Sequence, residues 1–153
     1  VRPSEAAGTK WDEIEFDKKL WRIPPERMKK KLEHVVPLSS QAIKLLLKLK
    51  DHTGHREYVF YSSRASEGHA NPSTANVALK RMGFQGRLVS HGMRSLASTT
   101  LNDEAFDRDI IEYALAHVDK NEVRSAYNRA QYIERRRTMM QWWSDHIDKA
   151  KKA

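Results

Sequence analysis

The sequence contains no cysteine, only six glycines and no long apolar run. Without cysteine, the chain cannot carry the disulfides that hold many small secreted domains together. Its longest unbroken apolar runs are four residues, at 58–61 and 113–116, whereas a membrane-spanning helix needs about 20. The first 30 residues also lack the apolar core of a secretory signal peptide. We therefore expect a cytoplasmic protein that makes no use of a membrane.

Charge is abundant and unbalanced. The 153 residues include 28 Lys and Arg against 20 Asp and Glu, which gives a formal net charge of +8 with histidine neutral. A basic surface attracts polyanions, and nucleic acid is the commonest of these in a cytoplasm. A chain of this length forms one domain by default. Because it starts at Val1 and opens directly on a helix start, we expect it to be a piece of a longer protein.

The first third of the sequence predicts a small sheet between two helices. Three segments alternate apolar and polar residues between charged turns, as strands with one solvated face do. Ser39 or Ser40 can cap the helix that follows. Its apolar residues Ile43, Leu46 and Leu47 share one face. The expected elements are a helix over 3–9, strands over 13–16, 20–23 and 34–38, a helix from 39 or 40 to 49, and a loop over 51–72.

The rest of the sequence predicts helices. Asn71 or Ser73, Ser90 and Asp107 are residues that cap helix starts, and Gly83 can end a helix. The expected helices cover 73–83, 91–101, 108–116, a short one after Asp119 that carries Tyr127, and 131–148, where Ile133, Met139, Met140, Trp143 and Ile147 are the candidate buried residues. The expected fold class is α+β, mainly helical, with a small three-stranded antiparallel sheet near the N-terminus.

His91 and Arg94 form a candidate anion site. They stand at i and i+3 in the segment HGMR, so both fall on one face at the first turn of a helix. The free N–H groups and the positive dipole end of that helix favour an anion at the same place. The planar guanidinium of Arg94, paired with a second arginine, can clamp a phosphodiester. Taken alone, the segment HxxR also fits residues of a surface salt bridge or a histidine that caps the helix.

Further segments extend this pattern along the chain. The series is VRPSEAAGTKWDEIEFD, IPPERMKKKLEHVVPLS, HGMRS, ALAH and AYNRA, followed by the tail MMQWWSDHID. In this order the segments resemble the catalytic domain of the tyrosine recombinases, the phage and genomic-island integrases, over essentially the whole chain. The resemblance implies that residues 1–153 are the C-terminal catalytic domain of an integrase, without its first helices and its N-terminal DNA-binding domains.

The resemblance also implies a set of catalytic residues. These are Arg2, Lys29, His91, Arg94, His117 and Tyr127. In this scheme Tyr127 attacks a DNA phosphodiester and forms a 3′-phosphotyrosyl link. Arg2, supported by Glu5, and Arg94 bind the non-bridging oxygens. No metal or organic cofactor is required, because the covalent intermediate keeps the bond energy for rejoining.

The remaining roles follow from the same resemblance. His117 is a further hydrogen-bond donor to the phosphate, and Lys29 is the general acid that protonates the leaving 5′ oxygen. The proton of the attacking tyrosine passes to His91 or to a phosphate oxygen. Two positions stay open. Tyr132 is the alternative nucleophile, since the best-known members space their last histidine and tyrosine by nine residues where this chain has ten, and Lys30 and Lys31 are alternatives to Lys29.

The implied function is site-specific DNA recombination, the integration or excision of a prophage or genomic island in a bacterial cell. The implied partners are double-stranded attachment-site DNA, other integrase protomers in a tetramer, and a directionality or DNA-bending protein. Two alternatives remain. One is a DNA-binding module without catalysis, and the other is a type IB topoisomerase, which uses the same chemistry as a monomer to relax supercoils. The segment HTGH at 52–55 predicts no metal site, because it lacks further ligands at a usual spacing.

Overall fold

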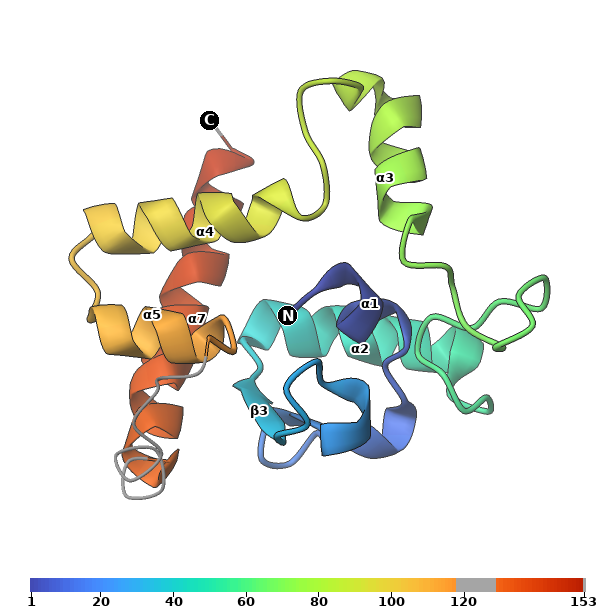
Figure 1. The fold of residues 1–153 in the computed structure, drawn as a ribbon, viewed down its shortest axis with the longest axis horizontal. Helices are drawn as coiled ribbons and strands as arrows, with labels where there is room; N and C mark the ends of the chain where they lie inside the picture. Colours follow the sequence, from blue (N-terminus) through green and yellow to red (C-terminus); the bar gives the residue numbers. More distant parts are fainter. Residues whose placement is uncertain (118–128, 153) are drawn as a thin grey trace.

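The computed structural model describes residues 1–117 and 129–152 (Figure 1). Its strands and longer helices are α1 (Pro3–Ala7), β1 (Ile14–Glu15), β2 (Leu20–Ile23), β3 (His34–Pro37), α2 (Ser40–Thr53), α3 (Thr74–Leu79), α4 (Gly92–Asp103), α5 (Arg108–Ala114) and α7 (Arg129–Ala150). Short helical turns are η1 (Trp11–Glu13), η2 (Pro25–Arg27) and η3 (Lys80–Phe84). The mainly helical α+β class is confirmed. The short helix expected around Tyr127 lies outside the described residues.

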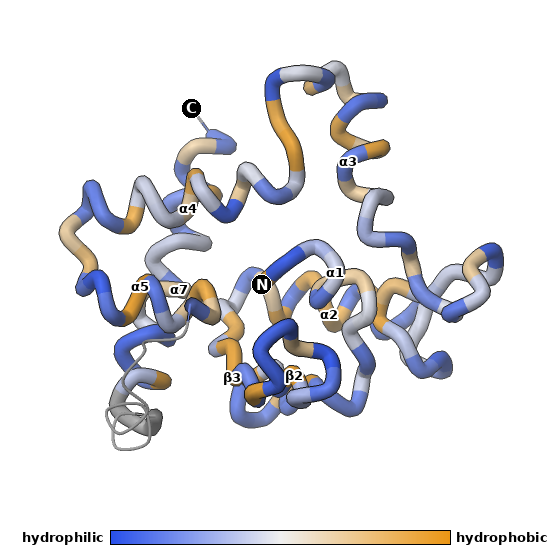
Figure 2. Tube along the Cα trace, viewed as in Figure 1, coloured by the Kyte–Doolittle hydropathy of each residue, from blue (hydrophilic) through white to orange (hydrophobic). Residues whose placement is uncertain are grey.

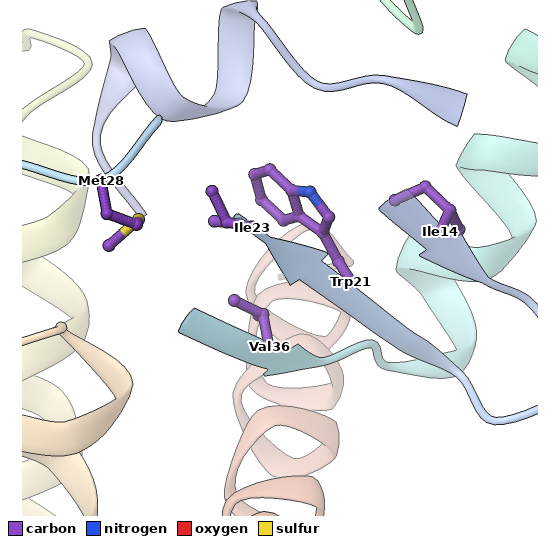
Figure 3. Close-up of a cluster of buried hydrophobic side chains, with 5 residues drawn as sticks. All are labelled: Ile14, Trp21, Ile23, Met28 and Val36. Carbon is purple, nitrogen blue, oxygen red and sulfur yellow. The ribbon is translucent and has the colours of Figure 1, made fainter. Parts of the chain in front are cut away.

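The three strands form one antiparallel sheet in the order β1-β2-β3, as the alternating pattern predicts. Ile14 pairs with Trp21, and Trp21 pairs with Val36, so these three side chains form one row on the same face of the sheet. Together with Ile23 and Met28 they make a buried apolar cluster (Figure 3). Each such side chain contributes about 1.5–3 kcal/mol by leaving water, and this cluster anchors the N-terminal part of the chain.

A second core lies where α4, α5 and α7 meet. Its buried members are Leu101, Ile110, Ile111 and Met139, and the ring of Phe106 packs edge-on against Trp142 nearby. The helix α7 also contacts the N-terminal part of the same chain. Its Ser144 hydroxyl donates to the Ser39 hydroxyl over 2.7 Å and Gln141 accepts from the Ser40 backbone N–H over 2.9 Å, while other α7 residues reach β3. This helix therefore joins the two cores.

Helix boundaries agree with the sequence where a cap is local. The Ser39 hydroxyl accepts from the Ala42 N–H at the start of α2, and the Asp107 carboxylate accepts from the Asp109 N–H at the start of α5. The prediction that Ser90 caps α4 is wrong, because His91 occupies the N-cap position of this helix. The backbone N–H of Ser90 instead donates to Asn76, a partner 14 residues earlier that no local pattern reveals.

Two helical faces also differ from expectation. The helix α2 continues to Thr53 instead of ending near 49, because no helix breaker occurs before Gly54. Leu46 packs against the sheet cluster, whereas Leu47 is 50% exposed and Ile147 of α7 is 47% exposed, so neither is a core residue. Helical spacing predicts which apolar residues share a face of the helix. Which of these residues are buried depends on the elements that pack against that face in the tertiary fold.

The helix α3 and the turn η3 project from the two cores, on the right of the view in Figure 1. Gly83 within η3 has a φ of 86°, a left-handed conformation that glycine adopts at little cost, and it ends this helical segment as expected. The apolar residues Val77, Met82 and Phe84 are exposed there, and Figure 2 shows orange stretches between polar ones in this part of the chain. No described helix is long and apolar enough to pass through a membrane.

Two buried basic side chains lie between β3, α5 and α7. Arg136 of α7 is fully buried, its Nη1 donates to the Val35 carbonyl over 2.7 Å, and its guanidinium lies 5.0 Å from the centre of the Tyr113 ring. Burial lowers the pKa of Arg136 to about 10. His34 of β3 is 5% exposed. Burial first, and then the nearby Arg136 charge, lowers the pKa of His34 from 6.5 to about 3.

We expect this buried histidine to make the chain less stable in mild acid. Because the folded pKa of His34 is depressed, only the unfolded chain takes up this proton as the pH falls from 6.5 toward 3. The free energy of unfolding should therefore drop by about 2 kcal/mol between pH 7 and pH 5 on account of His34. Urea unfolding of wild type and His34→Asn at both pH values measures this contribution, with the exposed His52→Asn as control. A His34→Asn variant with the wild-type pH dependence would contradict the assignment.

Candidate active site

Arg2 is fixed by the first turn of α1. Its backbone N–H donates to Glu5 Oε2 over 2.6 Å and its side-chain Nη1 donates to Glu5 Oε1 over 2.8 Å. Glu5 is 3% exposed. Burial alone would raise the pKa of this carboxyl, but the hydrogen bonds and charge of Arg2 lower it below its ordinary value. The ion pair therefore sets the direction in which the Arg2 side chain leaves the helix.

Arg94 lies in the first turn of α4, within electrostatic range of Arg2. Its Nη2 donates to the Leu115 carbonyl and lies 3.1 Å from Nε2 of His117. Among the described residues, Nη1 of Arg94 is buried without a hydrogen-bond partner. Burial, and then the positive charge of Arg2, lowers the pKa of Arg94. Two guanidinium groups whose charges act on each other create a positive potential that favours an anion.

His117 follows the end of α5. Ala116 takes a left-handed conformation with a φ of 53°, and the chain then turns so that the imidazole faces α4. Nδ1 of His117 lies 2.7 Å from Oε2 of Glu112. Because a carboxylate only accepts hydrogen bonds, Nδ1 carries a proton and Nε2 is the acceptor of the Arg94 N–H in this arrangement. The ring is about half exposed, so an incoming ligand can reach it.

The structure brings Arg2, Arg94 and His117 together, but not all six predicted residues. His91 is exposed at the N-cap of α4, and Lys29 is exposed in the turn between η2 and β3 rather than on a strand. Within residues 1–117 and 129–152, no side-chain hydrogen bond or ion pair joins either of them to the other three, although the Arg94 backbone N–H donates to the His91 carbonyl over 3.1 Å. The alternatives Lys30 and Lys31 are exposed in the same turn.

The two candidate nucleophiles differ in what the structure describes. Tyr127 lies outside the described residues. Tyr132 is half-buried near the start of α7, and its ring packs edge-on against Tyr113 at 5.6 Å between centroids. It also lies against the second core. These contacts give Tyr132 a packing function in the helical part of the molecule.

Sequence reasoning missed Glu112, which orients the imidazole of His117. The only signal is an acidic residue five positions before the histidine, and this spacing normally puts two residues on different parts of a helix surface. The contact exists because α5 ends at Ala114 and Ala116 reverses the chain. The contact between Arg2 and Glu5 was easier to predict from the sequence, because residues at i and i+3 meet in the first turn of a helix.

Comparison with known proteins gives a family for this chain. The model of the phage integrase family matches residues 1–134. The prophage integrase IntA of Escherichia coli K12 is 54% identical over 150 residues, which cover 98% of this chain and 36% of that protein. The integrase of Enterobacteria phage P4 is 39% identical over 164 aligned positions, 97% of this chain and 37% of that protein.

A solved structure agrees in fold. The integrase from mycobacterium phage Brujita matches with a TM-score of 0.70 over 92% of this chain and 46% of its own length, at 16% sequence identity. This likeness concerns the fold alone. The chain spans less than half the length of the curated relatives it matches. On the family match and the identities to these relatives, the chain belongs to the phage integrase family.

Proposed function

We propose that this chain is the catalytic domain of a site-specific DNA recombinase that works through a 3′-phosphotyrosyl intermediate. The longer protein would add the first helices of the domain and the N-terminal DNA-binding domains. The observation that carries the proposal is the convergence of Arg2, Arg94 and His117 from three separate segments of the chain. The names of the relatives, a prophage integrase and a phage integrase, support the same activity.

The geometry suits a phosphodiester. Two guanidinium groups within electrostatic range of each other favour the binding of an anion, and each can offer parallel N–H donors to non-bridging oxygens. The unpartnered Nη1 of Arg94 is one such donor. His117, oriented by Glu112, presents Nε2 beside Arg94, where we propose it as a further hydrogen-bond donor to the phosphate. These donors stabilise the charge that builds up in the transition state.

The proposed reaction is a transesterification. The phenolic oxygen of Tyr127 forms a bond to the scissile phosphorus while the bond from phosphorus to the 5′ oxygen breaks. The phenol gives its proton to His91 or to a phosphate oxygen, and Lys29 protonates the leaving 5′ oxygen. An exposed lysine in a turn has the mobility that this last role requires. Attack by the freed 5′ hydroxyl of a second strand reverses the step and completes the exchange.

The proposed partners are double-stranded attachment sites, further integrase protomers in a tetramer, and a directionality or DNA-bending protein, all in the cytoplasm and on the nucleoid. A DNA-binding module without catalysis would have no use for a nucleophilic tyrosine in addition to two phosphate-binding arginines. A type IB topoisomerase would share the chemistry but relax supercoiled DNA as a monomer. Joining two separate attachment sites therefore distinguishes a recombinase from it.

Covalent trapping tests the proposal. The longer protein is incubated with labelled attachment-site DNA that carries a nick next to the cleavage position, so that the short 5′ fragment diffuses away and rejoining fails. We expect a protein–DNA adduct on a denaturing gel, attached through the 3′ phosphate, with a free 5′ hydroxyl on the released fragment that a polynucleotide kinase labels directly. If no adduct forms on DNA that the protein binds, the DNA-binding module takes the place of the recombinase.

A further inference from the structure

A buried ion pair lies behind the candidate active site and has no assigned role. Arg27 of η2 donates through Nη1 to Oε2 of Glu13, and the side chains are only 18% and 7% exposed. The same Oε2 accepts the indole N–H of Trp21 over 2.9 Å. A buried ion pair contributes little to stability on average, because both charges lose their hydration. This cost raises the question of what the pair holds in place.

The second half of the Arg27 guanidinium contacts α1. Its Nη2 donates to the backbone carbonyl of Glu5, and a Cβ added at Gly8 would lie 3.2 Å from the same nitrogen. The absence of a side chain at Gly8 therefore lets Arg27 lie close against the end of α1. With five residues, α1 is too short to be stable or fixed by its own hydrogen bonds.

These contacts form one continuous path to the active site. Trp21 belongs to the sheet cluster and donates its indole N–H to the Glu13 carboxylate. The same carboxylate accepts a hydrogen bond from Arg27. Arg27 donates to the backbone carbonyl of Glu5. The Glu5 carboxylate in turn accepts from both the backbone N–H and the side chain of Arg2. The position of the Arg2 guanidinium is thus tied to the core of the sheet through two buried carboxylates and one partly buried arginine.

We propose that Arg27 and Glu13 are positioning residues that fix α1, and through it Arg2, against the scissile phosphate. This inference rests on the proposed recombinase function. Catalytic groups have to be held to within about 0.5 Å of their productive positions, and a displacement of about 1 Å can cost about 100-fold in rate. An arginine that reaches both Glu13 and the Glu5 carbonyl supplies this rigidity, because its planar fork fixes two directions at once.

The test compares cleavage by the longer protein and its Arg27→Met variant on the nicked attachment-site DNA at saturating protein. We expect the variant to form the adduct about 10- to 100-fold more slowly, with a DNA affinity within about threefold of wild type. The matched control is Arg22→Met. Arg22 pairs with Glu15 and is 42% exposed, so the same loss of charge there should change the rate by less than about twofold.

A second substrate separates positioning from general structural damage. In this DNA a methylphosphonate replaces the scissile phosphate, so one charged non-bridging oxygen becomes an uncharged methyl group. If Arg27 acts through the Arg2 guanidinium, the defect of Arg27→Met should shrink to within about threefold on this substrate, as should that of Arg2→Ala. A protein that is merely less well folded would be slowed equally on both substrates, and that result would overturn the inference.

A further variant covers the case in which Arg27→Met unfolds. Glu13→Gln keeps the shape of the side chain and an acceptor for Trp21 but removes the charge that orients Arg27, so it should show the same dependence on the substrate. Wild-type cleavage by both variants overturns the inference and leaves the recombinase proposal intact. A wild-type protein that forms no adduct on bound DNA overturns both.

Discussion

Tyr127→Phe in the longer protein should abolish the covalent adduct and leave its affinity for attachment-site DNA within about twofold. Phenylalanine keeps the ring but lacks the hydroxyl oxygen that forms the bond to phosphorus, and no other group in the proposed scheme replaces it. Loss of a nucleophile typically lowers the chemical rate by about 10⁴-fold or more. The measurement is adduct formation on nicked DNA over hours, together with a gel-shift titration on intact DNA.

The matched control for this prediction is Tyr132→Phe. The ring of Tyr132 packs edge-on against Tyr113, and phenylalanine preserves this packing. We expect the Tyr132→Phe protein to form the adduct at a rate within a few fold of wild type. Digestion of the wild-type adduct, followed by mass spectrometry of the peptide that carries the nucleotide, identifies the residue independently. An adduct that survives in Tyr127→Phe and disappears in Tyr132→Phe would reverse the assignment.

The sheet was predictable because its information is local. Each strand alternates apolar and polar residues between charged turns, and period-two alternation fixes which side chains meet the core. The register that pairs Trp21 with Val36 and with Ile14 required the structure, because strand order alone does not fix it. The caps Ser39 and Asp107 were predictable for the same reason, because each contacts a backbone N–H two or three residues away.

The active site was only partly predictable, because its contacts combine local and distant residues. Arg2 and Glu5 meet within one turn of helix. The approach of Arg94 to His117 joins residues 23 apart, and it depends on the left-handed conformation of Ala116, which alanine does not favour and no pattern announces. The resemblance to the tyrosine recombinases named these residues, but the pairing of His117 with Glu112 required the structure.

The positions of two arginines inside the fold were also not predictable from the sequence. Arg27 and Arg136 are arginines, a type that is mostly exposed in folded proteins, and each stands in a basic stretch of sequence that fits a solvated face. In the structure Arg136 is fully buried under Tyr113 and Arg27 bridges Glu13 to α1. Their positions follow from where α7 and α1 come to rest on the sheet, which is a property of the whole fold.

Arg94→Ala should lower the cleavage rate of the longer protein by about 10²- to 10³-fold at saturating DNA, the usual cost of removing a preorganised donor to a developing negative charge. Arg94 combines the three features that make such a donor effective. It is partly buried, it lies within electrostatic range of Arg2, and one of its nitrogens is unpartnered among the described residues. Arg94→Lys keeps the charge but loses the planar fork, so we expect it to recover only part of the rate.

The control for Arg94→Ala is Arg87→Ala, which removes the same charge from an exposed residue a few positions before α4. The Arg87 guanidinium lies 6.0 Å from the Phe84 ring centre, and its loss should change the rate by less than about twofold. Thermal unfolding separates catalysis from stability, since Arg94 also holds the Leu115 carbonyl. If Arg94→Ala weakened DNA binding but cleaved bound DNA at the wild-type rate, Arg94 would serve affinity alone, as a phosphate anchor rather than part of the catalytic apparatus.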